Sequence, residues 1–237
     1  MNNTPEKQTD TCGSLALASG SASFSEFPKM ARLSRECIIS EKIDGTNAQI
    51  FVSPLGAWEQ IPMHSLGVFD LGGALHYMAA GSRTRWITPS EDNYGFAGWV
   101  ARNIDQLKTL GAGRHFGEWW GAGIQRKYGM TEKRFSLFNV SRWCLHGSTP
   151  NQIANADPRV VKLQDVLPPC VGLVPVLFRG GFTTGACDDA LDQLRSSGSS
   201  ANAGFMKPEG IVCFHVAANV GFKKTLERDE APKSLYG

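Results

Sequence analysis

The stretch Lys42-Ile43-Asp44-Gly45-Thr46-Asn47 decides how the fold is interpreted. Short apolar runs, at 37–40 before it and 47–52 at its end, are expected to be β-strands. Asp-Gly is a common turn pair between strands, so this stretch is predicted to be a turn that displays a lysine. A lysine amine is nucleophilic only when it is neutral, and its ordinary pKa is about 10.4. A nucleophilic lysine here would need desolvation or nearby positive charge, including Mg²⁺, to lower that pKa.

Two acidic residues farther along the chain are candidates for the same site. Glu118 lies in the apolar run 116–121, and Glu209 lies in 207–212. An isolated buried charge is costly, so each carboxylate is expected either to have a structural partner or to serve a function.

Cationic and aromatic side chains are further candidates for the same site. Alternation along 221–225 puts Lys223 and Phe222 on opposite faces. If Phe222 points into the core, Lys223 faces a cleft and Lys224 faces away. Arg83 and Arg85 are further cations. Phe135 and Phe138 lie on opposite faces of a predicted strand, so one of them could supply an aromatic slot, although an isolated Phe in a strand usually belongs to the core.

The composition is typical of a cytoplasmic globular protein. The chain has 237 residues, of which 42% are hydrophobic and 19% charged, with no apolar run that would span a membrane. Its six scattered cysteines contain no C-x-x-C pair and are expected to be free thiols. The net charge of +2 is not that of a bulk nucleic-acid binder, but a local basic face would suffice.

Strands outnumber helices in the predicted order of elements. Helices are expected at 94–110 and 187–196. The predicted strands are 37–40, 47–52, 115–119, 135–140, 172–178, 210–216 and 220–225. Because strands and helices do not alternate strictly, the order favours an α+β fold. Residues 1–25 are interpreted as a loose arm and 26–237 as one domain, while 53–81 has no structural interpretation.

Four pieces in order, KIDGTN, FGEWWG, PEGIV and GFKKT, resemble the motifs of the covalent nucleotidyltransferase superfamily. This superfamily includes DNA ligases, RNA ligases and mRNA capping enzymes, and the resemblance spans Lys42 to Thr225. DNA ligases and capping enzymes typically carry arginine where this chain has Asn47. With asparagine at this position, the chain resembles the RNA ligases similar to phage T4 RNA ligase 2 and the kinetoplastid editing ligases.

The resemblance implies a fold and a set of roles. It implies two antiparallel sheets with flanking helices around an ATP cleft, and Mg²⁺ (or Mn²⁺) as the metal. Lys42 would be the adenylated nucleophile and Lys223 would contact the α-phosphate. The other implied nucleotide-binding residues are Glu41, Ile43, Asn47, Arg83, Glu118, Phe138, Glu209 and, as an alternative to Thr225, Lys224; the implied metal-binding residues are Asp44, Glu118 and Glu209.

The chain departs from the family pattern in two places. The last motif usually reads lysine, any residue, lysine, but here the second lysine position is Thr225. The sequence also ends soon after this motif, so we expect neither an OB-fold nor a separate C-terminal domain. A helper protein is one expected way to replace the missing domain.

The function implied is that of an ATP-dependent RNA ligase, which transfers AMP from a lysine to a 5′-phosphate and seals it to a 3′-OH. The acceptor could be RNA, DNA or a hybrid. Its contacts are expected from Arg126, Lys127, Lys133 and Arg134, which could equally be a solvated loop. Alternatives are a minimal DNA nick-sealing ligase, a capping-type guanylyltransferase, and a non-catalytic nucleotide- or nucleic-acid-binding domain.

Overall fold

The computed structural model describes residues 27, 29–138, 167–227 and 229. The chain divides into two compact units, Met1–Met30 and Ala31–Gly237, and the elements below belong to the second. The loose arm predicted for 1–25 lies outside the described residues. In the described part of the chain, no helix is long and apolar enough to cross a membrane.

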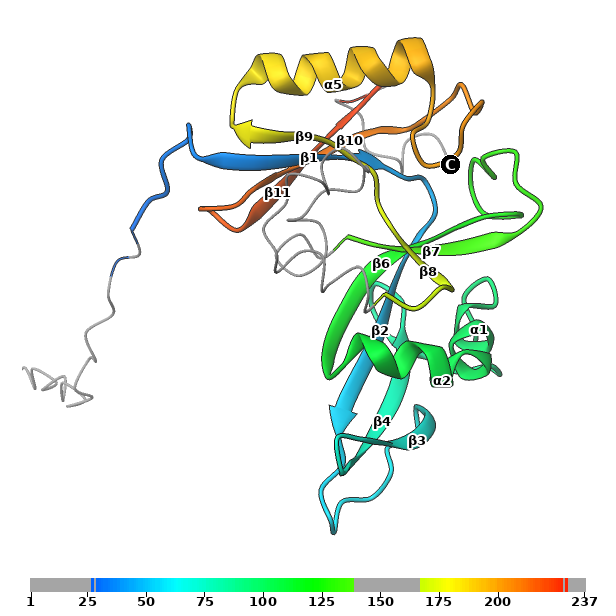
Figure 1. Cartoon of the computed structure of the whole chain (residues 1–237). Helices are drawn as coiled ribbons and strands as arrows, with labels where there is room; N and C mark the ends of the chain where they lie inside the picture. The colour runs from blue at the N-terminus through cyan, green and yellow to red at the C-terminus, as the bar shows by residue number, and fades with distance from the viewer. Residues whose placement is uncertain (1–26, 28, 139–166, 228, 230–237) are drawn as a thin grey trace, which may run out of the picture. The chain divides into compact units, whose positions relative to one another are not determined.

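Two β-sheets form the framework (Figure 1). The four-stranded sheet has the order β11 (Val220–Thr225), β10 (Gly210–His215), β1 (Glu36–Lys42) and β9 (Val176–Gly181), and all neighbours are antiparallel. The seven-stranded sheet has the order β3 (Ser65–Leu71), β4 (Ala74–Gly81), β2 (Thr46–Pro54), β6 (Gly113–Gly121), β7 (Lys133–Leu137) and β8 (Val171–Leu173), with β5 (Trp86–Ile87) paired to β4. The α+β class is confirmed, but β7 and β8 are parallel, so the prediction of two antiparallel sheets is wrong for this pair.

The helices pack against separate sheets. Helix α5 (Thr184–Ser197) covers one face of the four-stranded sheet, and its buried Leu191 and Leu194 share a core with Ile39 and Ile211 (Figure 1). Helices α1 (Phe96–Arg102) and α2 (Ile104–Leu107) and the 3-10 turn η1 (Lys108–Leu110) contribute to a larger core on the seven-stranded sheet. The cysteines described, Cys37, Cys170, Cys187 and Cys213, are free thiols as predicted.

The chain passes between the sheets at two points. The first is the turn 43–45, which joins β1 to β2. The second is the pair 174–175, which joins β8 to β9 and divides the single strand predicted over 172–178. The backbone N–H of Glu41 donates to the carbonyl of Pro175 at 2.9 Å, so the two crossings lie side by side.

The segment 53–81, which the sequence left unexplained, contains the β3–β4 hairpin. Gly72 and Gly73 form its turn with φ values of 66° and 83°, and the N–H of Gly73 donates to the Asp70 carboxylate at 3.1 Å. A Gly-Gly pair is a recognised hairpin signal, so this turn could have been found from the sequence.

The helix predicted over 94–110 is broken at Asn103. The Asn103 side-chain amide donates to the Trp99 carbonyl at 2.7 Å, which takes the acceptor that a continuous helix would give to the backbone N–H. That N–H bonds to Val100 instead, and the backbone leaves helical geometry at φ −114° and ψ 14°.

Helix α5 begins three residues earlier than the predicted Cys187. Thr183 is its N-cap, and its hydroxyl accepts from the N–H of Ala186 at 3.1 Å. No acidic residue lies in its first turn. The helix ends at Ser197, one residue beyond the predicted 196, and Gly198 follows with φ 78°.

Asp92 holds the start of α1, and removing its carboxylate is expected to destabilise the protein. The carboxylate accepts from the N–H groups of Ala97 and Gly98 at 2.8 and 2.9 Å. Asp92→Ala should cost about 1–2 kcal/mol, as the loss of a helix cap does, and lower the melting temperature by about 2–8 °C. Calorimetry against Asp105→Ala, whose side chain is 95% exposed, would check this. Equal melting temperatures would contradict a capping role.

Candidate active site

The turn between β1 and β2 is pressed against β6. Ile43 and Asp44 are only 4% and 8% exposed, and a Cβ at Gly45 would lie 2.4 Å from the Trp119 carbonyl oxygen. No side chain fits there, because real Cβ atoms do not approach backbone this closely. The glycine of the quoted motif is therefore required by the close approach of two strands.

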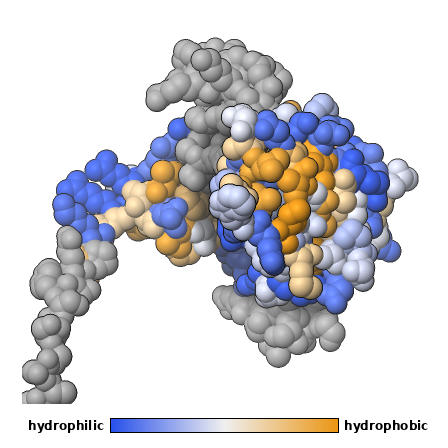
Figure 2. Space-filling view, turned by 90° about the horizontal axis from the view of Figure 1, so that it is seen from below, coloured by the Kyte–Doolittle hydropathy of each residue, from blue (hydrophilic) through white to orange (hydrophobic). Residues whose placement is uncertain are grey.

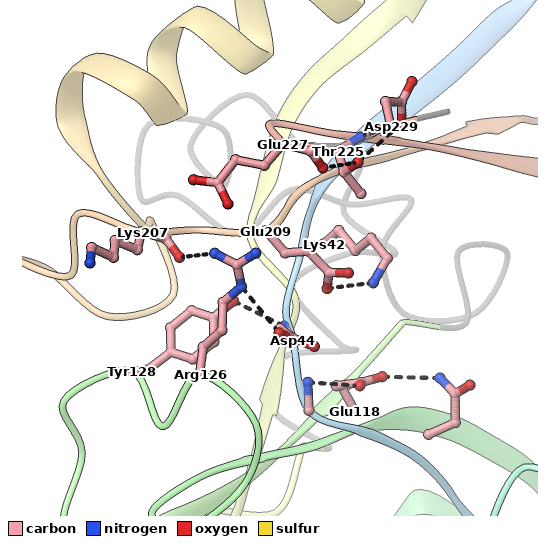
Figure 3. A network of polar contacts seen from close by, with 12 residues as sticks. Lys42, Asp44, Glu118, Arg126, Tyr128, Lys207, Glu209, Thr225, Glu227 and Asp229 are labelled. Atoms are coloured by element: carbon pink, nitrogen blue, oxygen red, sulfur yellow. Dashed lines mark hydrogen bonds and ion pairs between the residues drawn. The ribbon is translucent and has the colours of Figure 1, made fainter. Parts of the chain in front are cut away.

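Lys42 lies at the end of β1 and keeps 22% of its side chain exposed (Figure 3). Its Nζ forms an ion pair with Glu209 Oε2 at 2.5 Å, and Glu209 is 3% exposed. Lys42 pairs across the strands with Gly210, so the motif PEGIV places its acid beside the lysine. The amine is thus oriented by a buried carboxylate while remaining open to a ligand.

Glu118 faces this pair from β6. Its Oε1 accepts from the N–H of Gly45 at 3.1 Å and its Oε2 from the amide of Asn47 at 3.0 Å. Burial raises the pKa of Glu118 to about 7, although the Lys42 charge and these two donors oppose the rise and Glu209 adds to it. The carboxyl group is therefore close to half-protonated at neutral pH.

Asp44, predicted to bind metal, and Arg126, predicted to bind nucleic acid, form an ion pair with each other (Figure 3). Arg126 Nε donates to Asp44 Oδ2 at 3.1 Å, and Arg126 also donates to the Lys207 carbonyl at 3.0 Å. The N–H of Asp44 donates to the hydroxyl of Tyr128 at 2.9 Å, and burial raises the pKa of that phenol. In this structure Arg126 fastens the lysine turn to the strand that carries Glu209. The geometry thus favours structural roles for Asp44 and Arg126 over metal or nucleic-acid binding.

A cavity of about 400 Å³ opens beside Lys42. Its walls combine predicted site residues with apolar residues that the sequence did not single out. The lining residues are Ser40, Glu41, Lys42, Ile43, Asn47, Phe116, Glu118, Phe138, Val174, Val212, Phe214 and Asn219. Phe138 lies in the wall as predicted for the aromatic slot, whereas Phe135 is fully buried in the core. Phe116 shares the face of Glu118 by alternation along β6, which was the available signal for it.

Glu41 lines the cavity, but its carboxylate is bound by the loop after α5, and its nucleotide-binding role stays a prediction. Alternation along β1 puts it on the α5 face, where it is 1% exposed. Its carboxylate accepts from Ser199 Oγ at 2.6 Å and from the N–H groups of Ser200 and Ala201 at 2.7 and 2.9 Å. Burial raises the pKa of Glu41 against these bonds. Its side chain anchors the loop after α5.

The last motif places its cations on opposite faces. Lys223 pairs with Val212, which pairs with Ser40, so it lies on the cavity face although it is not in the cavity wall. Because β11 is an edge strand, Lys223 also borders a second cavity on the α5 side. Lys224 points the other way and binds Asp188 of α5 at 2.7 Å, and its nucleotide-binding role stays a prediction.

Thr225 occupies the position of the missing lysine. It pairs with Gly210, which pairs with Lys42, so it shares the row of the nucleophile. Its hydroxyl donates to the carbonyl of Glu227 at 2.9 Å, and its N–H donates to Asp229 Oδ1 at 2.7 Å (Figure 3). The hydroxyl is therefore engaged within the chain.

The remaining predicted cations lie outside the cavity wall. Arg83 is exposed in the connection from β4 to β5. Lys127 is exposed at a φ of 59°, Lys133 donates to the Tyr94 carbonyl at 2.7 Å, and Arg134 binds Glu132 at 2.6 Å. The nucleotide-binding role of Arg83 and the nucleic-acid roles of Lys127, Lys133 and Arg134 stay predictions.

The site suits a divalent metal that is bound partly by the protein and partly by the phosphates of a substrate. Among the described residues, no group of three His, Cys, Asp or Glu side chains is arranged to hold a metal ion. Mg²⁺ is commonly bound by one or two carboxylates together with substrate phosphates and water. Glu118 and Glu209, on either side of Lys42, are suited to that arrangement.

A sequence-family model described as RNA ligase matches residues 35–225. The match covers most of the chain and includes every strand of both sheets. This chain belongs to the RNA ligase family. No curated protein matches it.

Solved structures similar to this RNA ligase family member include an RNA ligase from Naegleria gruberi. A variant of that enzyme with ATP and Mn has 19% sequence identity and a TM-score of 0.48, over 82% of this chain and 51% of that chain. A variant with AMP and Mn has 19% identity and a TM-score of 0.48, over 81% and 50%. The chain thus spans about half the length of those enzymes.

The raised pKa of Glu118 predicts a pH-dependent loss of folding stability in this RNA ligase family member. A carboxyl whose pKa is higher folded than unfolded favours folding below its ordinary value, and this contribution is lost as the pH rises through the folded value. The free energy of unfolding of the parent should therefore fall, relative to Glu118→Gln, between about pH 4.5 and pH 7. Urea titrations across this range would measure it, with Glu91→Gln at a 78% exposed side chain as the baseline. Parallel pH curves for the parent and Glu118→Gln would contradict the buried-carboxyl assignment.

Arg126→Gln is expected to act on stability rather than on polynucleotide binding. Because it leaves Asp44 without its charged partner, the change should cost about 2 kcal/mol. Arg195→Gln is a matched control, since Arg195 and Asp192 form an ion pair with side chains 56% and 69% exposed and such pairs contribute about 0–1 kcal/mol. Thermal unfolding measures both. A flattened salt dependence of nucleic-acid affinity in Arg126→Gln, without loss of stability, would restore the original prediction.

Proposed function

We propose that this chain catalyses ATP-dependent ligation of RNA through a lysyl-AMP intermediate. The observation that carries the proposal is the solvent-accessible Lys42 amine, held 2.5 Å from Glu209 at the edge of a 400 Å³ cavity. Membership in the RNA ligase family supports RNA as the substrate. The cavity has the apolar and aromatic lining that suits a nucleotide base.

In the first step, the Lys42 Nζ lone pair attacks the α-phosphorus of ATP. A P–N bond forms, and the bond from the α-phosphorus to the bridging oxygen breaks with its electron pair on pyrophosphate. Glu209 Oε2 is placed to receive the proton that Nζ loses. The metal, when bound, offsets charge on the phosphates.

The other polar groups position the reactants. Asn47 and Glu118 are paired in register at the cavity wall, where they are placed for the ribose and the metal-bound phosphates. Lys223 is placed by strand register on the same face and would approach the α-phosphate. Phe116 and Phe138 provide aromatic surface for the base.

Two further transfers complete the reaction. A 5′-phosphate oxygen attacks the AMP phosphorus, the P–N bond breaks, and the Lys42 amine is regenerated. A 3′-hydroxyl then attacks the activated 5′-phosphate, which forms the phosphodiester and releases AMP. Both steps use the same protein groups that face the phosphorus in the first step. A helper protein is proposed to assist them.

Three narrower assignments are part of the proposal. ATP is the expected nucleotide, with Mg²⁺ or Mn²⁺, and a cytoplasmic location agrees with the free thiols among the described residues. RNA, DNA or a hybrid of the two could supply the ends, with family membership favouring RNA. A capping-type reaction with GTP is the second candidate, and Asn47 in place of arginine disfavours it.

Incubation with α-labelled ATP and Mg²⁺ tests the nucleophile directly. After denaturing electrophoresis, the parent should carry label, whereas Lys42→Ala and Lys42→Arg should carry none. The arginine variant keeps the positive charge beside Glu209, so its failure would identify the nucleophile rather than the ion pair. Lys108→Ala, at a lysine that binds the exposed Asp105, is the control and should label as the parent does.

Two outcomes would change the assignment. Preference for GTP over ATP would move it to capping chemistry. Absence of label in a parent whose intact mass shows no AMP already attached would leave a non-catalytic nucleotide-binding domain.

A further inference from the structure

The outward face of the seven-stranded sheet extends the active site along two strands. Strands β2 and β6 pair in register, so Asn47 lies opposite Glu118, Gln49 opposite Phe116, and Phe51 opposite Arg114. Each pair shares one face, because alternate residues of a strand point the same way. The last pair lies four residues along β2 from the first, a distance of about 14 Å at roughly 3.4 Å per residue.

An aromatic group surrounds that last pair. The His64 and Trp86 rings are parallel within 2°, with centroids 4.7 Å apart, and Phe51 lies 5.6 Å from Trp86. The guanidinium carbon of Arg114 lies 4.4 Å from the Phe51 ring centroid and 5.3 Å from that of Trp86. We call Phe51, His64, Trp86 and Arg114 the outer platform.

The outer platform is separate from the buried cores. Ile50 and Val52, which flank Phe51 in the sequence, are 0% exposed and face the core beneath α1. Phe51, His64 and Trp86 are half-buried, and Arg114 is exposed. The platform is therefore a partly exposed part of the sheet face that core packing does not explain, and within it Arg114 also donates to the Gln49 side chain at 2.9 Å.

The surroundings of the platform favour a negatively charged, flat ligand. Arg83 and Arg85 precede Trp86. The Arg85 side chain is 52% exposed, forms a 3.7 Å ion pair with Glu91 and donates to the carbonyls of Trp86 and Glu91 at 3.5 and 3.3 Å. Between the platform and the cavity lies Phe116, 38% exposed. Seen from below, the surface carries a hydrophobic patch bordered by hydrophilic residues (Figure 2).

We propose that the outer platform stacks the bases of a single-stranded segment of the polynucleotide whose end is joined at Lys42. The proposal rests on the proposed function for the direction of the strand, which runs from the cavity past Phe116. Aromatic faces and arginine bind single strands with little sequence preference, because every base presents a π-face. Arg83 and Arg85 would contact phosphates at that end.

The spacing predicts how long the strand must be. About 14 Å separates the Asn47–Glu118 pair from the platform, by the register of β2 and β6. A stacked strand rises about 3.4 Å per nucleotide, so the platform meets bases about four nucleotides from the joined end. A strand of twelve nucleotides reaches it, whereas a strand of three does not.

Fluorescence anisotropy with 3′-labelled, 5′-phosphorylated RNA of twelve and of three nucleotides tests the platform without ATP. Arg114→Gln, Phe51→Leu and Trp86→Leu should each weaken binding of the twelve-nucleotide strand by about 5- to 100-fold, the range for loss of one stacked base. Binding of the three-nucleotide strand should not change. Leucine keeps apolar volume at both aromatic positions, and melting temperatures identify any variant that loses its fold.

Arg102→Gln is the matched control. Arg102 is exposed on α1, the helix that packs on the opposite face of the same sheet, so its loss removes one surface charge away from the platform. Its affinity for the twelve-nucleotide strand should stay within about twofold of the parent, the effect of a distant charge at moderate salt.

Three results would overturn the platform. They are unchanged affinity in the folded platform variants, equal losses in Arg102→Gln, and equal affinity of the parent for the two strand lengths. Unchanged affinity in the folded platform variants would indicate that this exposed face binds a protein partner instead. Because the measurement needs no nucleotide, failure of the platform leaves lysyl-AMP formation untouched, and failure of lysyl-AMP formation leaves the affinities interpretable.

Discussion

The close contact between Gly45 and β6 is the constraint on which the site depends. The carbonyl of Trp119 comes so near that a side chain at position 45 is excluded, and this contact lets the N–H of Gly45 reach Glu118. The same turn ends β1 at the nucleophile and begins β2 at Thr46. One tight turn thus sets the spacing between an amine on one sheet and a carboxylate on the other.

Charges around the turn are arranged in pairs that keep the nucleophile accessible. Arg126 neutralises Asp44 and holds the Lys207 carbonyl, while Glu209 is left to the amine. Isolated, each of these buried acids would be costly, but together they form a network in which the side chains of Lys42 and Arg126 stay 22% and 28% exposed. The contrast with Glu41 is instructive, because the neighbouring acid is directed to the opposite face and serves the loop after α5.

Local patterns in the sequence predicted β1, β2, β6, β7, β10 and β11 and the order of the motifs, because alternation and turn residues act over a few positions. They missed β3, β4 and β5 and merged β8 with β9. The lysine, Glu118 and Glu209 were placed correctly relative to the strands, and the structure brings them together. Pairings set by distant segments escaped prediction. The bond from Arg126 to Asp44 spans 82 residues, and the one from Ser199 to Glu41 spans 158. The break at Asn103 was missed because a side-chain amide competes with the backbone for one carbonyl, which periodicity does not record.

The two crossings between the sheets have a mechanical consequence. Lys42 and Glu209 belong to the four-stranded sheet side, and Asn47 and Glu118 belong to the seven-stranded one. A nucleotide bonded to Lys42 and in contact with Asn47 would link the two sheets to each other. The lysyl-AMP form would then be stiffer than the free chain, and departure of AMP would remove this link between the sheets when ligation is complete.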